Sequence, residues 1–258
     1  DGLARCPAVE VSTFVVKTPI RICLAVILAS ATPNLVAESA TLTGTALQPI
    51  RFNLPDFPIR LLHTGVLQGQ VELVFEVRPD GLVSDWLITA YTHREFARAT
   101  ERAVSGWRFE PGDAIHTIDL SLRFETRGVV VLVRQLGTQS DLENRELVFR
   151  PCPPAELDRP PQPVRTVSPA YSHQMAERGG TGTVRVHYFI DQEGKVRVPF
   201  PEASAHPLLA TLAISAVKQW QFEPPTCRGR PTIVRAEQVF RFQPTTARMG
   251  AVGAVPSG

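Results

Sequence analysis

The amino-acid sequence predicts an α+β protein with two small domains, each a three-stranded antiparallel sheet with two helices on one face. The first observation behind this prediction is an internal repeat: the segment Trp107–Pro111 returns 113 residues later as Trp220–Pro224, with the shared pattern W-x-F-E-P. The second observation is that each repeat shows the same succession of apolar patterns. Apolar residues alternate over two predicted strands, then recur at helical spacing, and then alternate again over a last strand. The shared positions expected to be structural are Gly69, Gly81, Trp107 and Pro111 in the first copy and Gly182, Gly194, Trp220 and Pro224 in the second.

The first copy spans residues 52–127 in this interpretation. A short helix near 58–64 precedes a strand over 70–77, where alternating apolar residues give the strand one buried face. The turn Pro79-Asp80-Gly81 leads into a second strand near 82–90, so the two strands form a hairpin. Thr92 and Glu95 match a capping box at the start of the next helix. Pro111 ends that helix, and the last strand is predicted over Ile115–Phe124.

The second copy spans residues 164–244 and follows the same order. A short helix near 172–178 precedes a strand over 184–190, and the turn at 191–194 leads into a second strand near 195–199. Pro207 lies in the first turn of the next helix, where its missing N–H costs little. Five extra residues around Cys227–Pro231 come before the last strand, which is predicted over Ile233–Phe242.

The segments outside the two copies have compositions of their own. Residues 17–37 resemble a signal peptide, with a basic start, a short apolar run and an Ala-x-Ala cleavage site, which would make residues 1–16 non-native upstream translation. An uncleaved anchor and a core segment are the alternatives for 17–37. Residues 128–163 are interpreted as extra strands near 129–134 and 146–150 followed by a Pro-rich linker. The Gly- and Ala-rich stretch 245–258 predicts a disordered tail.

Composition and motifs exclude several classes of function. The net charge of +2 indicates neither a nucleic-acid partner nor an acidic tail. The histidines and cysteines show no metal-ligand spacing, and no pair of groups is placed for acid/base or nucleophilic chemistry. We therefore expect no metal, no cofactor, no small-molecule substrate and no enzymatic activity. Export would expose Cys152 and Cys227 to an oxidising compartment, so they are a candidate disulfide.

The ordered set of motifs resembles the C-terminal domain of the TonB family. In the second copy it comprises Pro169-x-Tyr171, Gly179-x-x-Gly182, the hairpin turn at 191–194, Trp220-x-Phe222-x-Pro224 and Phe240-x-Phe242. In the first copy it comprises Pro55-x-Phe57-Pro58, Gly65, Gly69, Pro79-Asp80-Gly81 and the segment 107–112. The resemblance covers about 55–125 and 168–243.

The resemblance implies a protein that binds partners rather than one that catalyses a reaction. TonB carries energy across the periplasm to outer-membrane receptors, whose extended TonB box adds as a strand beside the last strand of the domain. By resemblance, the partner-binding residues on the last strands are Ile115, Thr117, Asp119, Ile233, Arg235 and Glu237. The residues expected near the partner contact are Phe57, Pro58 and Tyr171.

The sequence also departs from that family. TonB itself has an uncleaved membrane anchor and a long spacer, whereas this chain has a short apolar leader, and its first copy follows soon after. Two hypotheses therefore remain. Either the chain is a periplasmic protein that binds extended segments of an envelope protein such as an outer-membrane receptor, or it is a structural module. In a structural module the sheet edges pair internally or in a homodimer, without coupling to a motor.

Overall fold

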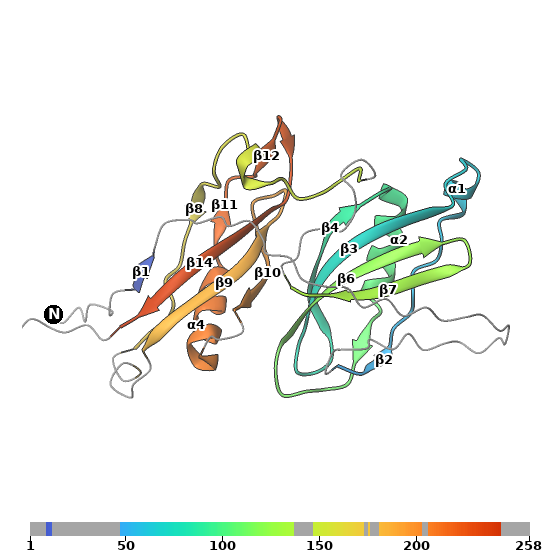
Figure 1. Cartoon of the computed structure of the whole chain (residues 1–258). Helices are drawn as coiled ribbons and strands as arrows, with labels where there is room; N and C mark the ends of the chain where they lie inside the picture. The colour runs from blue at the N-terminus through green and yellow to red at the C-terminus, as the bar shows by residue number, and fades with distance from the viewer. Residues whose placement is uncertain are drawn as a thin grey trace, which may run out of the picture.

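The computed structural model describes residues 9–11, 47–136, 147–172, 175, 181–202 and 206–243. Within this part of the chain, two lobes lie side by side, and each holds an antiparallel sheet backed by helix (Figure 1). The predicted leader at 17–37, the predicted tail at 245–258 and most of the predicted helix at 172–178 lie outside the described residues. No helix of the described part is long and apolar enough to cross a membrane.

The first lobe contains the first copy of the repeat and one further strand. Its elements are β2 (Pro49–Arg51), α1 (Ile59–Leu62), β3 (Gln68–Val77), β4 (Val83–Tyr91), α2 (Arg94–Val104), β5 (Arg108–Phe109), β6 (His116–Glu125) and β7 (Gly128–Arg134). The first sheet has the strand order β4-β3-β6-β7, and β2 pairs with β5. The copy itself contributes three strands, and the fourth, β7, lies just after it, where an extra strand was predicted near 129–134.

The second lobe repeats this arrangement. Its elements are β8 (Pro163–Arg165), β9 (Gly182–Ile190), β10 (Val196–Pro201), α4 (Pro207–Val217), β11 (Gln221–Phe222), β12 (Thr226–Cys227), β13 (Arg230–Pro231) and β14 (Val234–Phe242). The second sheet has the order β1-β14-β9-β10, and its fourth strand, β1 (Val9–Val11), comes from the N-terminal region. The predicted α+β class with antiparallel sheets is thus confirmed; each copy contributes three strands to its sheet, and the fourth strand of each sheet comes from outside the copy.

Equivalent glycines fix the hairpin of each copy. Gly81 and Gly194 have φ angles of 78° and 77°, in the left-handed region that favours glycine. A Cβ at either position would collide with a carbonyl oxygen, that of Phe109 or of Phe222. The N–H of Phe109 donates to the carbonyl of Gly81 at 2.9 Å, and the N–H of Phe222 donates to the carbonyl of Gly194 at 2.8 Å. The repeated spacing of glycine and W-x-F-E-P therefore encodes one tertiary contact, formed twice.

The helix α2 begins differently from the prediction. Its N-cap residue is His93, which makes no side-chain capping hydrogen bond. The Thr92 hydroxyl instead accepts a hydrogen bond from the N–H of Gln70 at 3.0 Å. The capping box at Thr92 and Glu95 is therefore wrong, because this threonine ties the end of β4 to β3.

The Pro-rich segment after β7 is bound to the second lobe. Cys152 and Cys227 form a disulfide with a Cα–Cα distance of 6.2 Å. The carboxylate of Asp158 accepts hydrogen bonds from the N–H groups of Arg228 and Gly229, at 2.8 and 2.9 Å. Between the disulfide and Asp158 lies a short 3-10 helix, η1 (Pro154–Glu156). The five extra residues of the second copy thus form the β12–β13 hairpin that receives this linker.

A third apolar cluster joins the two lobes. It consists of Val74 and Leu87 from the first lobe and Phe189, Val198, Phe200 and Ile233 from the second, all buried. We call this cluster, with the polar contacts around it, the junction. Because the second lobe covers the outer face of β3, residues such as Glu72 and Glu76 are 4% and 2% exposed. The prediction that β3 buries only one face is therefore wrong.

Candidate partner-binding site

The last strand of the first copy is not a sheet edge. The strand β6 lies between β3 and β7, and β7 pairs with it from Asp119↔Arg134 to Glu125↔Gly128. Thr117 and Asp119 lie within β6, and Ile115 lies just before it with 54% of its surface exposed. Of these three residues, Asp119 lies opposite Arg134 of β7, so the predicted binding edge is wrong there for an incoming strand; the pairing with β7 does not extend to Thr117 or Ile115.

The last strand of the second copy has a different neighbour. On one side β14 pairs with β9 along its whole length, from Val234↔Ile190 to Phe242↔Gly182. On the other side it pairs with β1 over three residues only, from Val11↔Phe240 to Val9↔Phe242. An extended segment of the chain therefore accompanies the C-terminal third of this edge.

The direction of the main-chain groups of β14 follows from the strand ladder. The carbonyl of Arg185 in β9 accepts a hydrogen bond from the N–H of Glu202 on the β10 side, at 2.9 Å. Alternate residues of a strand direct their main-chain groups to opposite neighbours. The even-numbered residues of β14 therefore bond to β9, and the odd-numbered ones direct their N–H and C=O groups to the outer edge. These outward-directed residues are Arg235, Glu237, Val239 and Arg241.

The predicted partner-contacting side chains of the second copy lie at or near the junction. Ile233 is 4% exposed and belongs to the junction cluster. The Glu237 carboxylate lies 2.6 Å from Nη1 of Arg185 and 3.7 Å from Nδ1 of His187. Arg235 is half-buried, and burial lowers its pKa although Asp119 and Glu237 oppose that effect. These side chains lie on the sheet face, so strand addition at the edge would depend on main-chain groups.

Phe57, Pro58 and Tyr171 have structural positions. Phe57 packs edge-on against Phe96 of α2, with ring centroids 5.2 Å apart. Pro58 precedes α1 as its N-cap residue. Tyr171 is 4% exposed and packs against Phe242 at 5.2 Å. A partner on the β14 edge would therefore lie near Tyr171 without having its ring as an exposed contact.

Asp85 is the main polar contact of the junction. Its carboxylate accepts hydrogen bonds from Nε of Arg197 and from the N–H of Val198, both at 2.9 Å. Arg197 also donates to the carbonyl of Trp86 at 2.7 Å. Val198 has a φ of 44°, which a β-branched residue rarely adopts, and its side chain is fully buried. A bulge in β10 thus places Val198 against the first sheet, a feature that no sequence motif signalled.

A buried cluster of charges lies on the same face of the first sheet as Val74 of the junction. Arg134 of β7 lies 2.7 Å from the Glu72 carboxylate and 3.8 Å from Oδ1 of Asp119. Oε1 of Glu72 and Oδ1 of Asp119 accept no hydrogen bond within the described part of the chain. Burial, with a smaller contribution from the Glu72 carboxylate, raises the pKa of Asp119 from 3.8 to about 7, although Arg134 and Arg235 oppose that rise. The first sheet and the second thus meet around a carboxyl group that titrates near neutrality.

This cluster predicts a pH dependence that the substitution Asp119→Asn removes. Between about pH 4 and about pH 7, the folded chain binds a proton at Asp119 that the unfolded chain has lost. As the pH rises through this window, the free energy of unfolding of the wild type therefore falls relative to that of Asp119→Asn. The fall is about 1.4 kcal/mol for each pH unit between the two pKa values. Denaturant titrations of both proteins across the window measure this difference. Parallel pH profiles would contradict the assignment.

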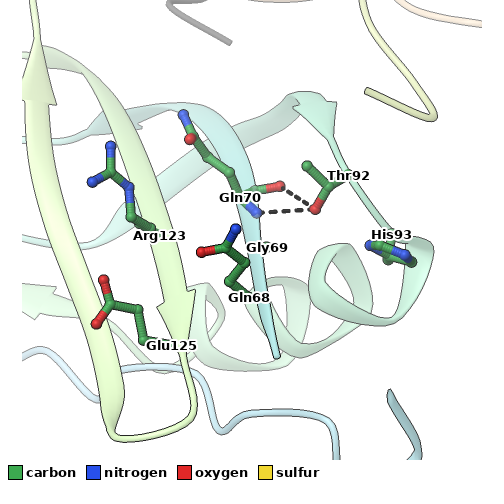
Figure 2. Close-up of a pocket in the computed structure, with 7 residues that line it drawn as sticks. All are labelled: Gln68, Gly69, Gln70, Thr92, His93, Arg123 and Glu125. Atoms are coloured by element: carbon green, nitrogen blue, oxygen red, sulfur yellow. Dashed lines mark hydrogen bonds between the residues drawn. The ribbon is translucent and has the colours of Figure 1, made fainter. Parts of the chain in front are cut away.

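A shallow polar pocket opens on the first lobe, away from the junction. Its lining residues are Gln68, Gly69, Gln70, Thr92, His93, Arg123 and Glu125, and Figure 2 shows the contact between Gln70 and Thr92 at its wall. Across the described residues, no group of three or more His, Cys, Asp or Glu side chains could hold a metal ion. The pocket brings together neither a nucleophile and a base nor a ligand set.

Comparisons with known proteins agree with the repeat. The family model of the Gram-negative bacterial TonB protein C-terminal matches residues 53–126 and 167–244. Two curated relatives are both named Protein TonB. The one from Pseudomonas aeruginosa is 30% identical over 74 residues, which are 28% of this chain and 21% of the relative. The one from Escherichia coli is 32% identical over 77 residues, which are 30% of this chain and 32% of the relative.

A solved structure is also similar, the solution NMR structure of Pseudomonas aeruginosa TonB CTD. It matches with 20% identity and a TM-score of 0.27, over 38% of this chain and 95% of that chain. The curated relatives are matched over at most about a third of their length. The two segments of the family model together cover more than half of the chain, which therefore belongs to the TonB C-terminal family and carries that domain twice.

Proposed function

We propose that this chain is a periplasmic protein that binds one extended segment of an envelope protein by strand addition along the outer edge of β14. The observation that carries the proposal is the pairing of Val9–Val11 with Phe240–Phe242, in which an extended segment is held on that edge. Such pairing needs main-chain groups and a row of alternating side chains, and no particular chemistry beyond them. Membership of the TonB family supports a partner in the cell envelope, and we propose an outer-membrane TonB-dependent receptor.

The two copies have different roles in this proposal. In the first sheet β7 covers β6 over seven residues, from Gly128 to Arg134. In the second sheet β1 accompanies three of the nine residues of β14. Replacing a seven-residue strand would break many more main-chain hydrogen bonds than replacing a three-residue one. Binding is therefore expected once per chain, at the second copy.

The test uses a synthetic peptide that carries the TonB box of an outer-membrane receptor, titrated calorimetrically into the full chain. We expect one peptide to bind per chain, and more tightly to a chain that lacks residues 1–16, since β1 then no longer competes. Val239→Pro removes an N–H that points to the outer edge and is expected to weaken binding about tenfold. The internal ladder to β9 stays intact in that variant, because proline is tolerated where the N–H faces outward.

The matched control is Val239→Thr, which keeps both the N–H and the β-branched shape and should bind as the wild type does. Circular dichroism of both variants checks that the sheet is unchanged. Equal affinity of Val239→Pro and Val239→Thr would overturn the binding edge. Absence of any binding would favour the second candidate, a structural module, which the internal pairing of β6 with β7 supports.

A further inference from the structure

Among the described residues, β7 is the last strand of the first sheet on that side. The strand order β4-β3-β6-β7 ends with β7, and no described strand lies on its other side. This strand also lies outside the two segments matched by the family model, which end at 126 and resume at 167. The family model therefore does not describe this edge.

The main-chain groups on this edge can be assigned from the ladder. Gln70 accepts a hydrogen bond from the N–H of Thr92 on the β4 side, at 3.0 Å, so the even-numbered residues of β3 bond to β4. Alternate residues of a strand bond to opposite neighbours, so the main-chain groups of the odd-numbered residues of β3 bond to β6, where their partners are even-numbered. The odd-numbered residues of β6 therefore bond to β7. In β7 the residues opposite these are the even-numbered ones. The N–H and C=O groups of Val129, Val131 and Val133 therefore point outward.

The side chains of β7 are apolar on both faces of the sheet. Val130, Leu132 and Val133 are 43%, 42% and 37% exposed, while Val129 and Val131 pack partly against the first core. Natural edge strands are usually protected from association by lysine, proline or a bulge. The sequence Gly-Val-Val-Val-Leu-Val-Arg has none of these within its length, and its pairing with β6 shows no irregularity.

We propose that the outer edge of β7 is an interface between two copies of this chain, which pair antiparallel about Val131 and join their first sheets into one continuous sheet. In this register Val131 lies opposite Val131 of the partner subunit, and Val129 lies opposite Val133 of the partner subunit. All three outward-pointing residues of each strand then form hydrogen bonds across the interface. A shift by two residues in either direction would leave one of the three without its counterpart.

Side chains and charges agree with a second copy as the occupant. In the same register Val130 lies opposite Leu132 of the partner subunit, so the exposed apolar residues cover one another. Arg134 lies opposite Gly128 of the partner subunit, which has no side chain and no charge. The guanidinium of Arg134 is directed into its own subunit, 2.7 Å from Glu72. The strand is thus self-complementary about a two-fold axis, as an isologous dimer requires.

Light scattering on the full chain after size-exclusion chromatography tests the oligomeric state. The wild type is expected to be a dimer that dissociates on dilution. Val131→Pro removes an outward N–H without breaking the ladder to β6, so it should be monomeric with an unchanged circular dichroism spectrum. Val131→Thr keeps the N–H and the branched side chain and should remain dimeric. A monomeric wild type at every accessible concentration would overturn the proposal and would favour an extended segment of another protein as the occupant.

Cysteine cross-linking tests the register without destabilising the fold. In a background with Cys6→Ser and Cys23→Ser, Val131→Cys should form a disulfide-linked dimer on mild oxidation, because the two cysteines lie opposite each other. Val133→Cys is the matched control, since in this register its two copies lie about 14 Å apart along the strands. Equal cross-linking of both variants, or cross-linking of neither, would overturn the register. The result is independent of peptide binding at β14, which uses the other sheet.

Discussion

Replacing Trp220 by alanine is expected to lower the free energy of unfolding by about 3–5 kcal/mol, the usual loss for a large aromatic side chain in a core. Trp220 is 4% exposed and lies between the helix α4 and the second sheet. Its ring centroid is 5.8 Å from that of Phe240 and 6.2 Å from that of Tyr188. Its indole N–H donates to the carbonyl of Val167 at 2.8 Å. The truncation removes all of these contacts together and leaves a cavity.

The matched control for this experiment is Trp86→Ala, the same substitution at a tryptophan of β4 that is only partly buried at the border of the first core. Denaturant unfolding followed by circular dichroism should show a clearly smaller loss for Trp86→Ala. Trp107 is fully buried and donates to the carbonyl of Asn53 at 2.8 Å, the equivalent contact of the first copy. Trp107→Ala should therefore behave as Trp220→Ala does. A loss below about 1 kcal/mol at Trp220 would show that the side chain is not part of the core.

The repeat allowed most of the fold to be predicted, because the repeated glycines and tryptophans make their contacts within their own copy. The last strand of the second copy was predicted over Ile233–Phe242 and is found over Val234–Phe242. The hairpin glycines have positive φ angles, and Trp107 and Trp220 are buried. The spacing of apolar residues indicates which face of each strand or helix is buried, and this is enough to predict that each sheet packs on its helix.

The candidate site could not be predicted in the same way, since it depends on which strand lies beside which. The valine-rich segment near 129–134 was interpreted as a strand, but nothing in its sequence says that it covers β6. Glu72 and Glu76 alternate with apolar residues and read as a solvated face, yet the second lobe buries them. Val198 has a strong preference for extended backbone, and only its contacts with Asp85 across the junction account for its conformation. These features arise from tertiary contacts, within the first sheet and between the copies, that no local sequence pattern records.

Removing the disulfide, by Cys152→Ala together with Cys227→Ala, is expected to lower the free energy of unfolding by about 4 kcal/mol. The loop that it closes has a sequence separation of 75 residues, and a cross-link of that length restricts the unfolded chain strongly. This loop contains the strands β8 to β11 and the helix α4 of the second lobe, including the hairpin that β9 and β10 form. The double substitution leaves no free thiol at either site, so the effect reports the cross-link itself.

The native fold of the linker should survive this loss at low denaturant. Asp158 still accepts its hydrogen bonds from Arg228 and Gly229, and its N–H donates to the carbonyl of Thr226 at 3.1 Å. The matched control replaces Cys6 and Cys23 by alanine, the cysteines in and upstream of the predicted leader, and should leave the unfolding transition unchanged. Thiol titration of the unreduced protein gives a second readout, in which Cys152 and Cys227 should not react. Reactive thiols at these positions, or a loss below about 1 kcal/mol, would mean that hydrogen bonds and packing alone hold the linker on the second lobe.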